Sequence, residues 1–198
     1  MELLDIAINI QGKTLPRDHA EALLDALSPH FPWLHTDEKT GIHPIKLVAD
    51  NGDIATLSKR SRLILRVHSK RLDALQKAQG LVVSVAGHSL QLGEAHGRAL
   101  LPHSTLYAYR IAINQQEEKK DEAAFVADME RELAHLAIRG EIICGLRQCL
   151  GFGEVFSMML HGINAEQSQR LQEQGLGAHR LLGCGIFVPH KSAAAVGS

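Results

Sequence analysis

The apolar residues of this chain follow the same order of strand and helix patterns twice, and this doubling constrains the fold more than any other feature of the sequence. In the first half, apolar and polar residues alternate over residues 3–10, which predicts a half-buried strand. Leucines at helical spacing then predict a helix over residues 20–27. The remaining elements predicted in this half are strands at 45–49 and 61–67, a short helix at 69–75 and a strand at 81–85.

The second half repeats this order. Its predicted elements are a strand at 105–114, a helix at 125–136, hairpin strands at 141–150 and 154–163, a helix beginning after Asn164 and a strand at 185–188. Two copies of a split βαβ unit predict an α+β protein with a tandem ferredoxin-like fold, βαββαβ twice. We expect one domain over residues 1–98, a second over 99–191, and a disordered tail over 192–198.

The composition bounds the class of protein. With 198 residues, of which 45% are hydrophobic and 22% charged, the chain can build two small cores. No apolar run is long enough to span a bilayer, and the first ten residues lack the basic start of a signal peptide, so we expect a cytoplasmic protein without a membrane partner. The three cysteines form no Cys-x-x-Cys pair; we expect free thiols, no metal site and no cofactor.

The charge is unevenly distributed along the chain. A formal net charge of −1 argues against a protein that coats nucleic acid with its whole surface. Residues 59–71 nevertheless hold six basic residues and no acid, whereas residues 117–141 are mostly acidic. One face of the first domain could therefore be positive enough to contact phosphate groups.

Two Gly-x-Gly pairs lie near the C-terminus, in the stretch GLGAHRLLGCGIFVPHK of residues 175–191. Five residues separate the two pairs, and a short apolar run follows the second. Glycine is expected where the backbone takes a positive φ or where another molecule approaches the backbone closely. The stretch therefore predicts either a tight turn after a helix or a surface built for close approach.

This stretch resembles the glycine-rich loop of the RAMP superfamily of CRISPR-associated RNA-binding proteins. The resemblance extends to FPWLHTDEKTGIHPIK at residues 31–46 and to LYAYRI at residues 106–111, and it covers essentially the whole chain. With its two-histidine segment, the chain is most similar to the family of CRISPR repeat-processing endoribonucleases, in its short MYXAN-type form. The resemblance implies a RAMP fold and metal-independent cleavage of precursor CRISPR RNA within its repeats, leaving a 2′,3′-cyclic phosphate. It also implies repeat RNA as the partner, recognised as a hairpin with flanking nucleotides.

The chemistry of such a cut suits histidine. The attacking 2′-hydroxyl of RNA is tethered beside the scissile phosphate, so an enzyme has to align it and move two protons. By resemblance, His35 lies where the family places its proton-transferring histidine; His43 is its partner or alternative, and Lys46 could stabilise charge on the phosphate. Either histidine could instead only hydrogen-bond the loop. The first helix lacks the tyrosine that many relatives carry, so proton transfer would rest on histidine and lysine, or catalysis mainly on alignment.

Basic residues and the glycine loop are the expected RNA contacts. Strand alternation places Arg62 and Arg66 on the face opposite the apolar one, where they contact RNA or form an ordinary solvated face. Recognition would rest on the shape of an RNA hairpin and its flanks. The full set of expected contacts is Arg60, Arg62, Arg66, Arg147, Arg170, Gly177, His179, Arg180, Gly183, Gly185 and Lys191.

Two other functions fit parts of the sequence. A catalytically inert RAMP subunit that holds guide RNA among other subunits of a CRISPR effector complex would share the fold and the glycine loop. The motifs His103-Ser-Thr105 and His190-Lys-Ser192 are typical of two-histidine phosphoesterases, but the second one begins the small-residue tail rather than a symmetric strand. The two-histidine segment at residues 35–43 favours the endoribonuclease.

Overall fold

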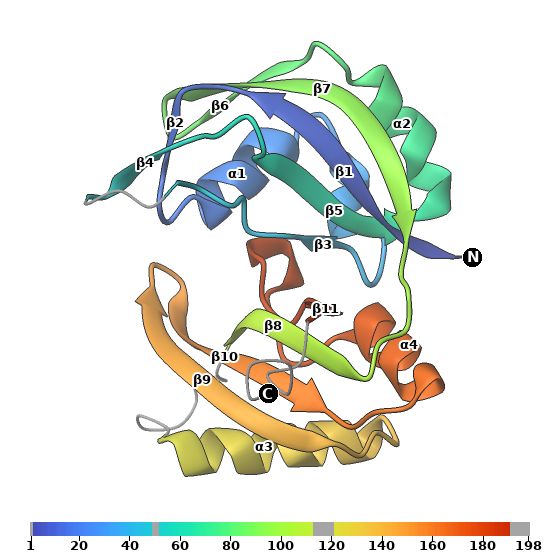
Figure 1. Ribbon diagram of the computed structural model, residues 1–198. Coiled ribbons are helices and arrows are strands. Elements are labelled where there is room, and N and C mark those ends of the chain that lie inside the picture. The colour runs from blue at the N-terminus through green and yellow to red at the C-terminus, as the bar shows by residue number, and fades with distance from the viewer. Residues whose placement is uncertain (1, 49–51, 113–120, 191–198) are drawn as a thin grey trace, which may run out of the picture. The chain divides into compact units, whose positions relative to one another are not determined.

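The computed structural model describes residues 2–48, 52–112 and 121–190, and it divides the chain into two compact units (Figure 1). Unit 1 comprises Met1–Ala99 together with Arg180–Gly183, and unit 2 comprises Leu100–His179 together with Cys184–Ser198. The middle of the glycine-rich stretch therefore belongs to the first unit, although its flanks belong to the second. Among the described helices, none is long and apolar enough to cross a membrane.

Unit 1 is built on an antiparallel five-stranded sheet in the order β3-β5-β1-β7-β6. Its strands are β1 (Leu3–Gln11), β3 (Gly41–Ile42), β5 (Arg62–His68), β6 (Val82–Val85) and β7 (His88–Ala99). A separate two-stranded sheet pairs β2 (Thr14–Pro16) with β4 (Ile54–Thr56). The helices are α1 (Ala20–Leu27), α2 (Leu72–Lys77) and the 3₁₀ turns Pro32–His35, Ser69–Arg71 and Arg180–Leu182.

One face of this sheet packs against α1 and α2. The alternating residues Ile6 and Ile8 of β1 join Leu63 of β5 and Leu23 of α1 in a single buried cluster. Each apolar side chain of this size stabilises the fold by about 1.5–3 kcal/mol when it is fully buried. Leu181, from the glycine-rich stretch, packs against the same cluster, which explains why residues 180–183 fold with unit 1.

Unit 2 is a four-stranded antiparallel sheet in the order β11-β8-β10-β9. Its elements are β8 (Thr105–Ala112), α3 (Glu122–His135), β9 (Glu141–Leu150), β10 (Gly153–His161), α4 (Ala165–Gln174) and β11 (Phe187–Pro189). The two helices, labelled in Figure 1, supply apolar side chains to one face of the sheet. There the ring centroids of Phe125 and Phe156 are 4.6 Å apart in a stacked arrangement. Asn164 caps α4 in a reciprocal pair with Gln167, and the helix begins after Asn164 as predicted.

Both units have the ferredoxin-like order of elements, but unit 1 departs from the prediction, which did not include the small β2–β4 sheet. Residues 45–48 form no strand, and the strand that pairs with β5 is the shorter Gly41–Ile42. On the side of β1 away from β5 lies β7, a strand that was not predicted. Its buried residues Leu90, Leu92 and Ala95 do not follow strict alternation, because a bulge opposite β1 falls between Leu92 and Ala95. A bulge inserts an extra residue and so breaks the period of two that strand prediction relies on.

Candidate functional site

The clearest constellation of ionisable groups in the described chain lies in unit 1, around Asp5 on β1. Its carboxylate accepts two hydrogen bonds from Arg66, from Nε to Oδ1 and from Nη2 to Oδ2, both at 2.8 Å. His43, which follows β3, places its Nε2 3.2 Å from the same Oδ1. The backbone assembles the group, because Asp5 pairs directly with Arg66 across the β1–β5 ladder, and the His43 N–H donates to Ile64 on β5.

The protonation states in this cluster follow from its burial. Burial alone would raise the pKa of Asp5, but the hydrogen bonds from Arg66 and His43 outweigh it and hold the pKa well below its usual range. Burial lowers the pKa of His43, and the hydrogen bond to Asp5 offsets this only in part. A neutral imidazole beside an ionised carboxylate must donate from Nε2, so the lone pair of His43 lies on Nδ1, where it can accept a proton.

Arg180 adds a second guanidinium beside this cluster. It begins the 3₁₀ turn Arg180–Leu182, and its Nη2 donates to the backbone oxygen of Lys39 at 3.1 Å. Its Nε and Nη1 are buried and have no hydrogen-bond partner among the described residues. Burial together with the charge of Arg66 lowers the pKa of Arg180 to about 10. A second guanidinium is therefore close enough to interact electrostatically with the Asp5 carboxylate.

His35 belongs to a separate hydrogen-bond network at the end of α1. It is exposed, and its Nε2 lies 2.8 Å from the hydroxyl of Ser28. The Ser28 hydroxyl already donates its single proton to the Leu24 carbonyl at 2.7 Å, so His35 must donate from Nε2. Its Nδ1 is the nitrogen left to exchange a proton with a ligand.

The segment between the two histidines is fastened to unit 1 by Asp37. Its carboxylate accepts two hydrogen bonds from Arg71, at 2.7 and 2.8 Å, and lies 3.6 Å from the ammonium of Lys70. The Arg71 guanidinium also stands over the ring of Trp33, 5.0 Å from its centre. These contacts hold the loop that carries both histidines, and they occupy two cations of the basic segment 59–71.

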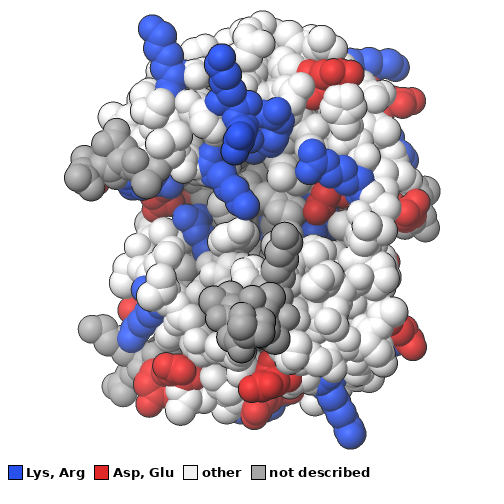
Figure 2. Space-filling view, in the orientation of Figure 1, with Lys and Arg blue, Asp and Glu red and all other residues white. Residues whose placement is uncertain are grey.

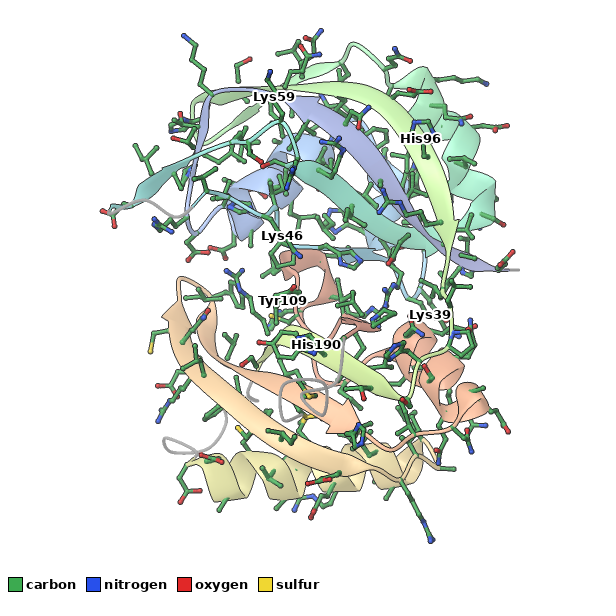
Figure 3. All side chains as sticks on the ribbon, viewed as in Figure 1. Lys39, Lys46, Lys59, His96, Tyr109 and His190 are labelled. Carbon is green, nitrogen blue, oxygen red and sulfur yellow. The ribbon has the colours of Figure 1, made fainter. Side chains whose placement is uncertain are left out.

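A basic turn, which we define as Lys46, Lys59, Arg60 and Arg62, lies beside β5. The Arg62 guanidinium donates to the backbone oxygens of Lys59 and Ser61, and the Ser61 hydroxyl donates to the backbone oxygen of Lys46. Lys46, Lys59 and Arg60 are exposed. Figure 2 shows Lys and Arg side chains gathered on this part of unit 1, and Figure 3 labels Lys46 and Lys59.

Arg66 does not join this surface, and the expectation of a solvent-facing Arg66 is wrong. Its side chain is 0% exposed, and its guanidinium forms a bidentate pair with Asp5. Alternation does send Arg66 away from the apolar face, but the side chain meets a carboxylate in register on the neighbouring strand. A buried guanidinium keeps its charge, so it has to remain beside that carboxylate.

The glycines of the C-terminal stretch meet protein atoms. Gly183 has φ +84°, and a Cβ on it would lie 2.8 Å from Cγ of Pro44, the residue after His43. Gly185 has φ +64°, and a Cβ there would collide with the backbone oxygen of Leu176. Gly177 has φ +67°, and His179 takes φ +65° without being glycine. The loop's shape requires these glycines, and Gly183 lets it pack against the loop of His43.

The other expected contacts belong to unit 2 or lie outside the described chain. Arg147 pairs with Glu154, and Arg170 pairs with Glu166, so each already has a carboxylate neighbour in unit 2. Lys191 lies outside the described residues.

The motifs of a two-histidine phosphoesterase gain no support from unit 2. The Nδ1 of His103 interacts with the backbone oxygen of Thr105 at 3.0 Å, inside its own turn.

The described residues contain no group of three or more His, Cys, Asp or Glu that could hold a metal ion. Cys144, Cys149 and Cys184 are free thiols; burial, which we also expected of them, holds for Cys184 alone, since Cys144 is half-buried and Cys149 is exposed.

Sequence reasoning missed Asp5. A signal was present, because alternation puts Asp5 and Arg66 on the faces opposite to the apolar faces of their strands. Only the pairing of β1 with β5, which requires the tertiary fold, brings the two charges together.

Comparison with known proteins gives consistent matches along the chain. The family model described as "Cas6 Crispr" matches residues 4–192. The CRISPR-associated endonuclease Cas6 of Myxococcus xanthus (strain DK1622) is 35% identical over 202 residues, covering 100% of this chain and 86% of that protein.

Solved structures share the fold at low identity. A CRISPR-associated protein Cas6 superposes with a TM-score of 0.70 at 11% identity, covering 96% of this chain and 100% of the other. Thermus thermophilus Cse3, solved with an RNA that represents a pre-cleavage complex, gives a TM-score of 0.54 at 15% identity, over 94% and 98% of the two chains. These likenesses establish the tandem ferredoxin-like fold.

Proposed function

Because the chain belongs to the Cas6 family of CRISPR-associated endonucleases, we propose that it cuts precursor CRISPR RNA within its repeats by attack of the 2′-hydroxyl beside the scissile phosphate. The products would be a 2′,3′-cyclic phosphate and a free 5′-hydroxyl. The observation that carries this proposal is the hydrogen bond from His43 to Asp5, inside a cluster that also holds Arg66 and Arg180. No step in the proposed reaction requires a metal ion.

His43 is suited to be the base. The Asp5 carboxylate fixes its tautomer through Nε2, and burial keeps the imidazole neutral, so Nδ1 is free to take the 2′-hydroxyl proton. Asp5 then stabilises the imidazolium that forms, as a carboxylate does beside any catalytic histidine. We assign the second proton transfer, to the leaving 5′-oxygen, to His35 in its protonated form, which carries a proton on Nδ1, the nitrogen not committed to Ser28, and returns to the neutral imidazole after giving that proton up.

The surrounding cations would stabilise the phosphate. Among the described residues, Nε and Nη1 of Arg180 have no hydrogen-bond acceptor, and a phosphate oxygen is the acceptor that an RNA substrate would supply. Lys46, at the edge of the basic turn, would add a point charge. The rest of the basic turn would hold the RNA backbone without reading its sequence.

Cleavage of repeat RNA from the protein's own locus tests this proposal. The wild-type chain should give one cut within each repeat, and a variant with both His35→Ala and His43→Ala should bind the RNA and leave it intact. A wild-type protein that binds the repeat but releases no product over many hours would contradict the proposal.

A further inference from the structure

A tyrosine-bearing face of the sheet lies in unit 2, and nothing in the proposed reaction uses it. The helices α3 and α4 cover the other face of this sheet, through Leu106 and Ala108 of β8. Alternation along β8 sends Thr105, Tyr107 and Tyr109 to the face opposite the helices. We call this opposite face the open face.

Three rings lie together on the open face. The rings of Tyr107 and Tyr109 meet edge to face, with centroids 4.9 Å apart and an interplanar angle of 87°. The His190 ring, just beyond β11, lies 5.4 Å from Tyr107 at 43°. Tyr109 is 43% exposed, and it is labelled with His190 in Figure 3. The three rings therefore form one aromatic cluster, in which Tyr109 and His190 are exposed and Tyr107 is half-buried.

Tyr109 lies at a bulge in β8. The register against β10 shifts so that Phe156 faces Ile111 while Met158 faces Ala108, which gives β8 one extra residue between Ala108 and Ile111. Bulges re-aim side chains in this way and are common beside functional sites. Both tyrosines of the chain stand here, whereas four of its five phenylalanines are buried in the cores.

The polarity of the open face suits a nucleic acid. In register with Tyr107 lie the apolar residues Met159 of β10 and Val188 of β11. In the neighbouring row, His161 hydrogen-bonds Thr105 at 2.6 Å. The acid in that row is Glu141, on the outermost strand β9, so these two rows of the described sheet place no carboxylate on the central strands to repel a phosphate.

We propose that the open face of unit 2 binds an unpaired base of the RNA by stacking on Tyr109, with Tyr107 and His190 as its neighbours. This inference rests on the proposed function, because it takes repeat RNA as the ligand. Four-stranded sheets with aromatic side chains on the central strands are a general solution for binding single-stranded RNA, and each stacked base contributes about 1–3 kcal/mol. The site adds recognition of the unpaired nucleotides that flank a hairpin.

Two substitutions of Tyr109 separate stacking from mere apolar contact. Tyr109→Phe keeps the ring, whereas Tyr109→Leu keeps apolar area but removes the flat π-surface. The probe is repeat RNA with a deoxynucleotide at the cut site to block cleavage, and its affinity is measured by fluorescence anisotropy. Tyr109→Leu should weaken binding of the full repeat by about 10-fold with an unchanged salt slope, while Tyr109→Phe binds like wild type.

A second probe locates the effect. The isolated stem-loop, without flanks, should bind wild type and Tyr109→Leu equally, and 2-aminopurine placed in the flank should change its fluorescence only with a ring at position 109. Because Tyr109 is exposed, both variants should melt like wild type. Equal affinity of Tyr109→Leu and wild type for the full repeat would overturn the inference and leave the face to a protein partner. If the wild-type chain bound no repeat RNA, both this inference and the proposed function would be wrong.

Discussion

At the scale of single residues, the proposed reaction depends on how burial and one carboxylate set the state of His43. Burial lowers the pKa of its imidazole, and Asp5 restores only part of the loss, so the neutral form that accepts a proton dominates near neutral pH. His96 is a useful contrast, since it is 57% exposed beside Glu94 on β7. Two histidines of one unit are thus placed in opposite environments.

We expect His43→Ala to slow single-turnover cleavage by roughly 10²-fold or more, with little change in RNA affinity, because it removes a positioned base. His96→Ala is the matched control and should cleave at the wild-type rate. The pH profile of kcat/KM carries a further expectation. His43 must be deprotonated to act as a base, so kcat/KM should fall as the pH is lowered through the pKa of His43. Because burial lowers that pKa, the fall should occur below the ordinary histidine pKa of about 6.5. A rate for His43→Ala equal to that of the control would remove His43 from proton transfer, and a larger loss in His35→Ala would exchange the two roles.

At the scale of elements, β5 carries two arginines, Arg62 and Arg66, that strand alternation places on the same face but that have different surroundings in the structure. Arg62 lies in the basic turn, with its guanidinium on backbone oxygens, while Arg66 is buried on Asp5. Removing one partner of a buried ion pair leaves the other charge without compensation, which costs about 3–5 kcal/mol. The two positions should therefore respond to the same substitution in different ways.

Arg66→Met should lower the free energy of unfolding by about 3 kcal/mol or more, measured in urea at pH 7, because Asp5 loses its main partner. Arg62→Met should lower it by about 1 kcal/mol or less, since Arg62 is only half-buried and its hydrogen bonds go to backbone oxygens rather than to a buried charge. The same two proteins then distinguish stability from binding: RNA affinity should fall in Arg62→Met. A fully stable Arg66→Met protein would show that the Asp5 cluster does not organise unit 1.

The glycine pattern of residues 175–185 is plain in the sequence, but the reason that glycine is needed there is found only in the tertiary structure. Gly185→Ala combines a left-handed φ with a collision against Leu176, whereas Gly162→Ala has φ +78° and open space around the added Cβ. Gly162→Ala should cost about 1–2 kcal/mol from its φ alone, and Gly185→Ala about 1–3 kcal/mol more from overpacking. Equal unfolding free energies for the two variants would mean that the loop shifts to relieve the collision.

At the scale of the whole molecule, the doubled pattern was enough to predict two ferredoxin-like units. Periodicity failed at β7, whose bulge breaks the alternation, and at residues 45–48, where an apolar run forms no strand. It could not place residues 180–183 in the first unit, because that depends on Leu181 packing against a core built from the other end of the chain. Resemblance to a known family led to the prediction of His35, His43 and Lys46 as site residues. Asp5 could be recognised only once the pairing of β1 with β5 was known.

The net charge of −1 means that RNA affinity must come from a local surface rather than from the molecule as a whole. Replacing both Arg60 and Arg62 with alanine should weaken repeat binding and flatten the dependence of log K on log salt by about one unit for each phosphate group that is no longer neutralised. Arg131→Ala on α3, whose side chain is 71% exposed beside Asp128, is the matched control and should leave the slope unchanged. The same slope in the double variant and wild type would mean that other cations bind the phosphates.

The most direct test of the central claim is cleavage of two otherwise identical repeat RNAs in excess EDTA, one of which has hydrogen in place of the 2′-hydroxyl at the cut site. If His43 activates that hydroxyl, the all-ribose RNA should be cut at the rate seen without EDTA and should end in a 2′,3′-cyclic phosphate, while the substituted RNA stays intact. Cleavage that stops in EDTA and returns with a divalent ion, or that proceeds on the substituted RNA, would contradict this mechanism.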